Sequence, residues 1–183
     1  MPDDLGTRIV SSIRTIQDFP IPGIPFPDVT SILEDHPELF RGVIDAFAER
    51  YKDEPPDAVV CIESFGYVFG VPLAYLLRTK LVLIRRAGKL PREAHREDYD
   101  MIYDTGRSLE MHAEAIRPGD RALVVDDILA SGASVLAAIR LIERSGGTCV
   151  GVACLMEASI LAEMPARKDI DARGIVVFAL ATI

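Results

Sequence analysis

The sequence lacks the features that would place a protein at a membrane, outside the cell or on nucleic acid. No apolar run approaches the ~18 residues that a membrane span requires. The first ten residues, MPDDLGTRIV, lack the basic-then-apolar layout of a signal peptide. The chain also has few positive charges: 20 Lys and Arg against 28 Asp and Glu leave a net charge of −8. Non-specific nucleic-acid binding requires a basic surface. We therefore expect a cytoplasmic protein with neither a membrane nor a nucleic acid as partner.

Other absences exclude particular kinds of binding site. Cysteine occurs only at positions 61, 149 and 154, without CxxC or metal-ligand spacing, so we expect reduced thiols in the core. No Gly-Lys-Ser/Thr and no GxGxxG run is present, which excludes a Walker loop and a dinucleotide fingerprint. With no repeat or low-complexity tract, 183 residues that are 49% hydrophobic and 26% charged predict one globular domain over 1–183.

The most informative stretch runs from position 121 to 144. Its apolar residues 122–125 predict a buried strand that two aspartates end, and a helical pattern follows from Val135. Between strand and helix lies a turn of small residues: Ala130, Ser131, Gly132, Ala133 and Ser134. The backbone N–H groups of such a turn, with a helix N-terminus, are typical of a phosphate site. The alternative is a helix cap beside a solvated acidic turn.

Asp126 and Asp127 follow the predicted strand, where ligands bind in open α/β sheets. Carboxylates repel a phosphate group. We therefore expect these two to accept hydrogen bonds from sugar hydroxyls or to face a hydrated Mg²⁺.

The rest of the chain alternates helical and extended patterns. We expect helices at 5–17, 35–52, 68–77 and 109–116, and strands at 58–62, 80–85, 148–156 and 175–181. Such alternation predicts an α/β protein with a mostly parallel sheet and helices on both faces.

Four blocks of the sequence resemble the adenine phosphoribosyltransferase family of type I phosphoribosyltransferases. They are Asp18–Ile24, Glu63–Gly66, Arg85–Pro91 and Val124–Ser134, in the order and spacing of the family. The resemblance extends over nearly the whole chain. It implies the type I phosphoribosyltransferase fold, in which helices flank a mostly parallel central sheet. It also implies a small N-terminal hood or lid, here residues 1–34.

The resemblance also implies a reaction and a set of site residues. The family transfers ribose 5-phosphate from phosphoribosyl pyrophosphate (PRPP) to a nucleobase and releases pyrophosphate. Its members are homodimers, and Mg²⁺ arrives bound to PRPP rather than to the protein. By resemblance, the turn 130–134 holds the 5′-phosphate, while Asp126 and Asp127 face the ribose. The pyrophosphate side comprises Glu63, Ser64, Phe65, Arg85, Arg86 and Lys89, and the base loop comprises Ile24, Pro25 and Phe26.

Two segments have alternative interpretations. Residues 19–27 contain four prolines, which predicts a stiff extended loop rather than a paired strand. This loop is either a strap over the core or a lid over a planar base, for which Phe26 offers a stacking face. The polar residues 86–108 form either a solvated surface or a flexible loop. Such a loop would close over the pyrophosphate and exclude water.

The sequence departs from the family mainly on the base side. Pro27 and Phe65 stand where the family has arginine, and Pro25 has no N–H for the edge of the adenine. In the run Met101–Asp104, Ile102 takes the place of the glutamate that acts as acid and base in the family.

These departures leave the acid/base group unassigned, with Asp104 and Glu97 as candidate replacements. On the PRPP side, Ala133 replaces the second glycine of the family, which is tolerable where its φ is negative. Three functions follow. The first is an adenine phosphoribosyltransferase, the second is a transferase with a changed acceptor, and the third is a PRPP sensor that has lost turnover.

Overall fold

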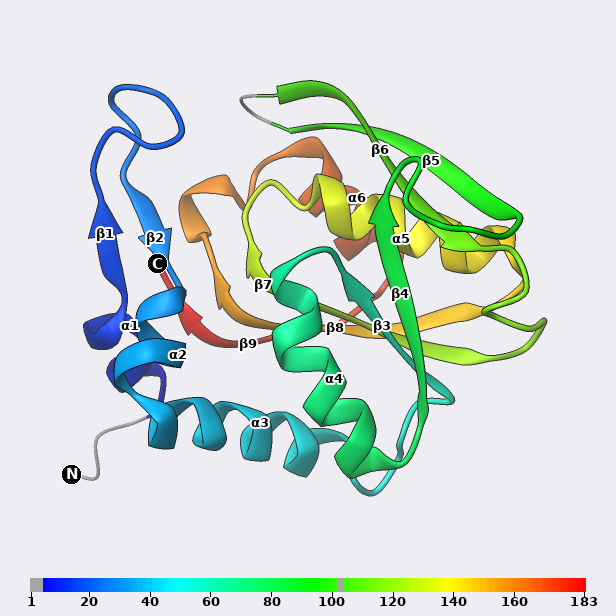
Figure 1. Cartoon of the computed structure of the whole chain (residues 1–183), viewed down its shortest axis with the longest axis horizontal. Coiled ribbons are helices and arrows are strands. Elements are labelled where there is room, and N and C mark those ends of the chain that lie inside the picture. The colour runs from blue at the N-terminus through cyan, green and yellow to red at the C-terminus, as the bar shows by residue number, and fades with distance from the viewer. Residues whose placement is uncertain (1–4, 102–103) are drawn as a thin grey trace.

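A seven-stranded sheet forms the centre of the computed structural model, which describes residues 5–101 and 104–183 (Figure 1). Its strands lie in the order β5-β6-β4-β3-β7-β8-β9. Their bounds are β3 Ala58–Ile62, β4 Lys80–Arg86, β5 Ala94–Met101, β6 Asp104–His112, β7 Arg121–Leu129, β8 Thr148–Glu157 and β9 Val177–Thr182. The five strands β4, β3, β7, β8 and β9 pair in parallel, whereas β5 and β6 are antiparallel. The predicted α/β fold with a mostly parallel sheet is confirmed.

Helices cover both faces of this sheet. They are α1 Leu5–Ser12, α2 Thr30–Asp35, α3 Pro37–Tyr51, α4 Phe65–Leu77, α5 Ala133–Arg144 and α6 Pro165–Ala172, with a 3₁₀ turn at Ser159–Leu161. In Figure 1, α3 and α4 lie on one side of the strands and α5 and α6 on the other. Every residue of β3 is buried, because a parallel strand between two helical layers meets apolar neighbours on both faces.

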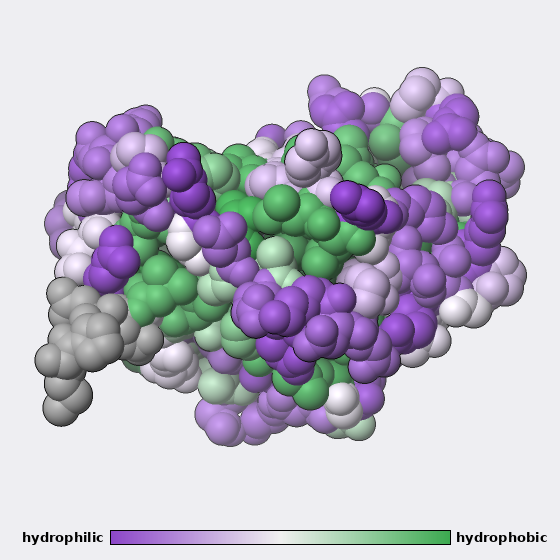
Figure 2. All heavy atoms as spheres, turned by 90° about the horizontal axis from the view of Figure 1, so that it is seen from below, coloured by the Kyte–Doolittle hydropathy of each residue, from purple (hydrophilic) through white to green (hydrophobic). Residues whose placement is uncertain are grey.

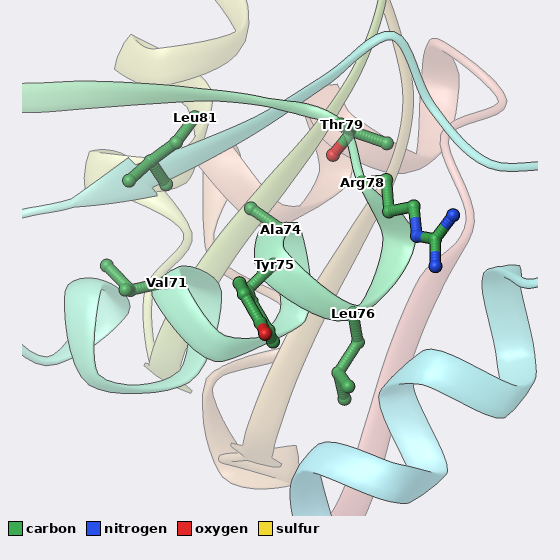
Figure 3. Close-up of a pocket in the computed structure, with 7 residues that line it drawn as sticks. All are labelled: Val71, Ala74, Tyr75, Leu76, Arg78, Thr79 and Leu81. Atoms are coloured by element: carbon green, nitrogen blue, oxygen red, sulfur yellow. The ribbon is translucent and has the colours of Figure 1, made fainter.

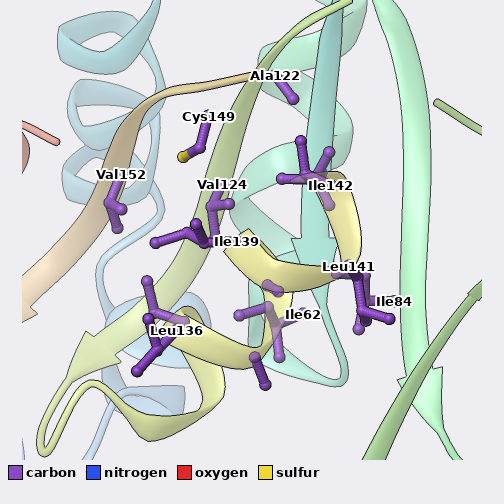
Figure 4. Close-up of a cluster of buried hydrophobic side chains, with 14 of the residues drawn as sticks. Ile62, Ile84, Ala122, Val124, Leu136, Ile139, Leu141, Ile142, Cys149 and Val152 are labelled. Atoms are coloured by element: carbon purple, nitrogen blue, oxygen red, sulfur yellow. The ribbon is translucent and has the colours of Figure 1, made fainter. Parts of the chain in front are cut away.

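Two apolar cores result from this layering. On the α3 and α4 side, Phe47 and Phe69 are fully buried beside Val59 and Cys61 of β3. On the α5 side, Ile139 and its neighbours pack on the other face of the same strands, as Figure 4 shows. Both cores hold buried cysteines without disulfides, as the sequence predicts.

The N-terminal hood differs from its prediction. The first helix ends at Ser12 rather than at residue 17, and β1 (Arg14–Ile16) pairs with β2 (Phe26–Asp28). The expectation that the proline segment forms no paired strand is therefore wrong for Phe26 and Pro27. Pro27 is tolerated opposite Thr15 because a two-stranded ribbon leaves edge positions that need no donor.

The polar segment after β4 also differs. The expected helix at 109–116 is wrong, because β6 continues to His112 and buries Leu109 and Met111 on one face. With β5, this strand makes most of 86–108 a hairpin rather than a loop, and its mobility stays a prediction. The helix expected at 68–77 begins three residues earlier, at Phe65. Apart from the strand predicted at 122–125, which β7 extends to Leu129, the other expected elements appear within two residues of their predicted bounds. Within the described residues, no helix is long and apolar enough to span a membrane.

Candidate active site

The candidate site lies where β3, β4 and β7 end, at the carboxyl edge of the parallel strands. Gly66 allows two loops of the candidate site to lie close together. A Cβ there would stand 2.5 Å from the carbonyl oxygen of Val125, so only glycine allows α4 to start against β7. As a result, the start of α4 lies against the backbone of Val125 and Asp126.

The small-residue turn is shorter than expected. Strand β7 continues to Leu129, so Asp126 and Asp127 lie within it, and only Ala130, Ser131 and Gly132 form the turn. Gly132 has a φ of +83°, which favours glycine. Ala133 and Ser134 open α5, and the helical, negative φ of Ala133 removes any penalty for its Cβ.

The start of α5 presents backbone donors. Gly132 occupies the N-cap position, and within the described residues no side chain caps the helix. The Ser131 hydroxyl accepts the Ala133 N–H only at 3.4 Å, at the long end of hydrogen-bond distances. N–H groups and the positive end of the helix dipole therefore face the turn, which is the arrangement that an anion requires.

The two aspartates lie in apolar surroundings. Asp126 is only 7% exposed, and its carboxylate accepts the N–H of Asp127 at 3.1 Å. Burial and the neighbouring charge of Asp127 raise the pKa of Asp126 well above its usual value. Burial also raises the pKa of Asp127. Donors that bind the carboxylates, such as sugar hydroxyls, would stabilise the charged form.

The loop after β3 is tied to the end of β4. The Glu63 carboxylate accepts the Arg86 N–H at 3.0 Å and the Arg85 Nε–H at 3.4 Å. The peptide between Glu63 and Ser64 is cis, and Phe65 begins α4. Arg85 also donates to the carbonyl oxygen of Lys89 at 3.1 Å. The Lys89 ammonium is exposed and has no ion-pair partner within the described part of the chain.

The hood presents aromatic rings on a compact loop. Phe19 and Phe26 meet edge to face with centroids 5.0 Å apart, and they are 50% and 36% exposed. Pro25 is exposed and Ile24 partly buried, and the Phe19 N–H donates to the Ile24 carbonyl at 3.2 Å. Among the described residues, no hydrogen bond or ion pair joins this loop to the turn after β7.

The hairpin of β5 and β6 carries Glu97, one of the two candidate replacements for the acid/base group. Glu97 pairs with Arg140 of α5 at 3.4 Å, so it already has a structural partner. Ile102 and Tyr103 lie outside the described residues. Sequence analysis missed Tyr99, which packs against the α5-side core. Burial raises the pKa of its phenol, with smaller effects of Arg107 and Asp126. It also missed α6, whose start the sequence signals only by Pro165.

Two further features bear on ligands. Over residues 5–101 and 104–183, no group of three or more His, Cys, Asp or Glu side chains is arranged to hold a metal ion. A hollow of about 610 Å³ lies on the outer side of α4 and β4 (Figure 3). It is lined by Val71, Ala74, Tyr75, Leu76, Arg78, Thr79 and Leu81, so it does not coincide with the candidate site.

An acidic pair on a strand, an uncapped small-residue turn and a second loop at the same sheet edge define the phosphoribosyltransferase class. In agreement, residues 29–180 match the sequence profile of the phosphoribosyl transferase domain. The chain is 42% identical over 183 residues to an adenine phosphoribosyltransferase of Thermobifida fusca, with all of both chains covered. It is 48% identical over 154 residues to one of Roseiflexus castenholzii, covering 84% of this chain and 88% of the relative.

Solved structures agree. An adenine phosphoribosyltransferase of Giardia lamblia, complexed with 9-deazaadenine, superposes with a TM-score of 0.90 at 32% identity over 98% of both chains. One of Rhodothermus marinus superposes with a TM-score of 0.87 at 40% identity, again over 98% of both chains. The chain belongs to the adenine phosphoribosyltransferase family.

Proposed function

We propose that the protein is a pentosyltransferase that transfers ribose 5-phosphate from PRPP to adenine and releases pyrophosphate. The observation that carries this proposal is the full-length match to a relative named for that activity, at 42% identity. The uncapped turn after the aspartates supports the PRPP half of the reaction.

In this proposal each loop binds one part of the substrates. The turn 130–132 and the first N–H groups of α5 hold the 5′-phosphate, while Asp126 and Asp127 accept hydrogen bonds from the ribose hydroxyls. Such hydroxyls stabilise the ionised form of these carboxyls, whose pKa values are raised in the free protein, so PRPP binding favours loss of their protons.

The other loops bind the leaving group and the base. The backbone at Glu63, Ser64 and Phe65 receives the pyrophosphate, and Lys89 with the Arg85–Arg86 pair supplies positive charge. Mg²⁺ enters as part of the PRPP complex. The hood residues Ile24, Pro25 and Phe26 cover the adenine. The transition state resembles an oxocarbenium ion, so catalysis rests on positioning and on charge beside the pyrophosphate.

The two other functions are not favoured. A changed acceptor or a PRPP sensor would require the departures at Pro25, Pro27 and Phe65 to outweigh full-length similarity to relatives named for adenine. Asp104 remains a candidate for the missing acid/base group, and a cytoplasmic location stays a prediction from the sequence.

The test is an assay of pyrophosphate release with PRPP, Mg²⁺ and adenine, hypoxanthine or guanine. We expect adenine to be the preferred acceptor. Asp127→Asn should reduce kcat/KM strongly, whereas Asp45→Asn on the exposed surface of α3 should not. Preference for another base would support the changed acceptor. PRPP binding without turnover on any base would support the sensor.

We also propose that the protein forms a homodimer through the outer face of α4 and β4. Figure 2, which views the molecule from the side of α3 and α4, shows apolar side chains among polar ones. Tyr75 is 83% exposed beside the hollow of Figure 3, and Leu76, Leu81 and Leu83 are also exposed. An exposed ring at a hollow fits a two-fold interface, in which the same self-complementary surface serves both copies.

The position of this surface also supports a second copy of the chain as its partner. Leu81 and Leu83 share their face of β4 with Arg85, whose side chain pairs with Glu63. A second copy seated there would therefore reach the pyrophosphate side of the site. Sedimentation should show a dimer, and Tyr75→Glu should dissociate it. Ile160→Glu, at an 87% exposed position elsewhere, should not. A wild-type monomer at micromolar concentration would contradict the proposal.

A further inference from the structure

Helix α6 lies directly against the turn to which we assign the 5′-phosphate. A Cβ on Gly132 would stand 3.1 Å from the backbone nitrogen of Arg167 and 3.2 Å from Cδ1 of Ile170. Ile170 is fully buried in the α5-side core, so it fixes this end of α6 on the sheet layer. The path of the turn is therefore set in part by where α6 lies.

The same turn is fixed on its other side by β8. Leu129, the last residue of β7, is the ladder partner of Glu157, and its carbonyl oxygen accepts the Ala158 N–H at 2.9 Å. The turn thus begins at the end of β7, beside the end of β8, and its last residue, Gly132, lies against α6. Its geometry depends on how these two elements are held relative to each other.

Arg167 connects the two elements. Its Nε–H donates to Oε1 of Glu157 at 2.7 Å, and its guanidinium also pairs with Asp171 one turn along α6. The Arg167 side chain is only 13% exposed and that of Glu157 20%, so water screens this pair less than it screens surface pairs. Both carboxylates compete for the charge of Arg167, which makes it a poor direct ligand for a phosphate.

We propose that Arg167 is a positioning residue for PRPP, and this inference rests on the proposed function. By joining Glu157 to α6, it holds the backbone of α6 against Gly132. The N–H groups at positions 130–133 are thereby kept aligned on the 5′-phosphate. Loss of this link lets the turn widen, which weakens the grip on ribose phosphate while the pyrophosphate loop, on the far side of the aspartates, is unaffected.

Arg173, the C-cap residue of α6, provides a matched control at the other end of the helix. Its guanidinium joins α6 to Glu143 near the end of α5, at 2.6 and 2.8 Å, and to Asp169 at 3.0 Å. It therefore also tethers α6, but at the end of the helix that is remote from the turn. A role that consists only of holding α6 in place predicts the same effect for both arginines.

The experiment compares Arg167→Gln, Arg167→Lys and Arg173→Gln in the full-length protein. We measure KM and kcat for PRPP at saturating adenine, and Kd for ribose 5-phosphate and for pyrophosphate by calorimetry. Arg167→Gln should raise KM for PRPP and Kd for ribose 5-phosphate by about tenfold or more. Small misplacements of a binding site commonly have effects of this size. The Kd for pyrophosphate and the kcat should change less than about threefold.

Arg167→Lys keeps a charge for Glu157 and should recover part of the loss. Arg173→Gln should lower the Tm without changing KM for PRPP. Equal effects of Arg167→Gln and Arg173→Gln on ribose 5-phosphate binding would overturn the inference, as would an unchanged Kd in Arg167→Gln. Failure of the proposed function would instead appear in the wild type, as the absence of transfer to adenine.

Discussion

Asp126 is a carboxyl group placed where charge is costly. It lies on β7 between two apolar cores, and burial together with Asp127 raises its pKa far above the usual value of 3.8. A raised folded-state pKa means that the folded chain binds the proton more tightly than the unfolded chain. The associated stability is fully present below about pH 4 and is lost as pH rises through the folded-state pKa.

We therefore predict that Asp126→Asn stabilises the free protein at pH 7.5. Each kcal/mol relieved corresponds to a rise in Tm of roughly 2–4 °C for a chain of this size. The gain should shrink as the pH falls toward 4, where the native carboxyl is already protonated. Activity should fall sharply in the same variant, because the amide cannot serve as an ionised acceptor.

Calorimetric melting at several pH values checks this prediction, with Asp45→Asn as the surface control. A lower Tm for Asp126→Asn at neutral pH would show that hydrogen bonds to the carboxylate outweigh its burial.

The residue types of the site were predictable, but their burial was not. Two aspartates followed by small residues fit either a phosphate and sugar site or a helix cap beside an acidic turn, and the family resemblance favours the first. The continuation of β7 to Leu129 depends on pairing of Ile128 and Leu129 with Met156 and Glu157 of β8. That pairing joins segments far apart in the sequence, and it places Asp126 inside the sheet.

At the scale of elements, the hairpin of β5 and β6 shows where sequence patterns are ambiguous. Leu109 and Met111 alternate with polar residues, yet their short run also fits the start of a helix. Strand β5 is an edge strand rich in charge, so it lacks the apolar signal of β3 or β7. Its conformation depends on contacts with β6 and α5, which the sequence does not display.

Those contacts include ion pairs that can be tested one at a time. Glu97 of β5 pairs with Arg140 of α5 at 3.4 Å, with side chains 25% and 43% exposed. Because solvent screens such a pair, Glu97→Gln should change the free energy of unfolding by less than ~1 kcal/mol. Loss of the pair should lower the free energy of local opening of the hairpin by a similar amount. Amides of β5 should therefore exchange with solvent about two- to fivefold faster.

Hydrogen exchange measured segment by segment checks this prediction. Glu49→Gln removes an exposed pair with Lys52 on α3 and should leave β5 unchanged. Unaltered exchange in β5 after Glu97→Gln would show that backbone pairing alone holds the hairpin.

At the scale of the whole molecule, both cores are built on the same strands. Val59 and Cys61 of β3 belong to the α4-side core, while Val60 and Ile62 belong to the α5-side core. If either helical layer separated, it would expose apolar side chains on strands that also carry the core of the other layer. We therefore expect a single cooperative unfolding transition.

Ile139→Ala tests this coupling, since Ile139 is fully buried under α5. The substitution should destabilise the protein by about 2–5 kcal/mol. The chain has no tryptophan, so tyrosine fluorescence follows the side chains, including Tyr51 of the opposite core. Its midpoint in urea should shift together with that of circular dichroism. Separate midpoints would show that the layers unfold independently, and Ile160→Ala serves as the exposed control.

The three buried cysteines give this architecture a practical consequence. Burial raises the pKa of Cys61 to about 12 and that of Cys149 to about 11, and it raises the pKa of Cys154 further. The nucleophilic thiolate is therefore scarce and enclosed in the native state. Cys61 lies in one layer, and Cys149 and Cys154 in the other. Alkylating reagents should consequently label this protein only as it opens, and mass spectrometry of the tagged peptides would reveal which layer yields first.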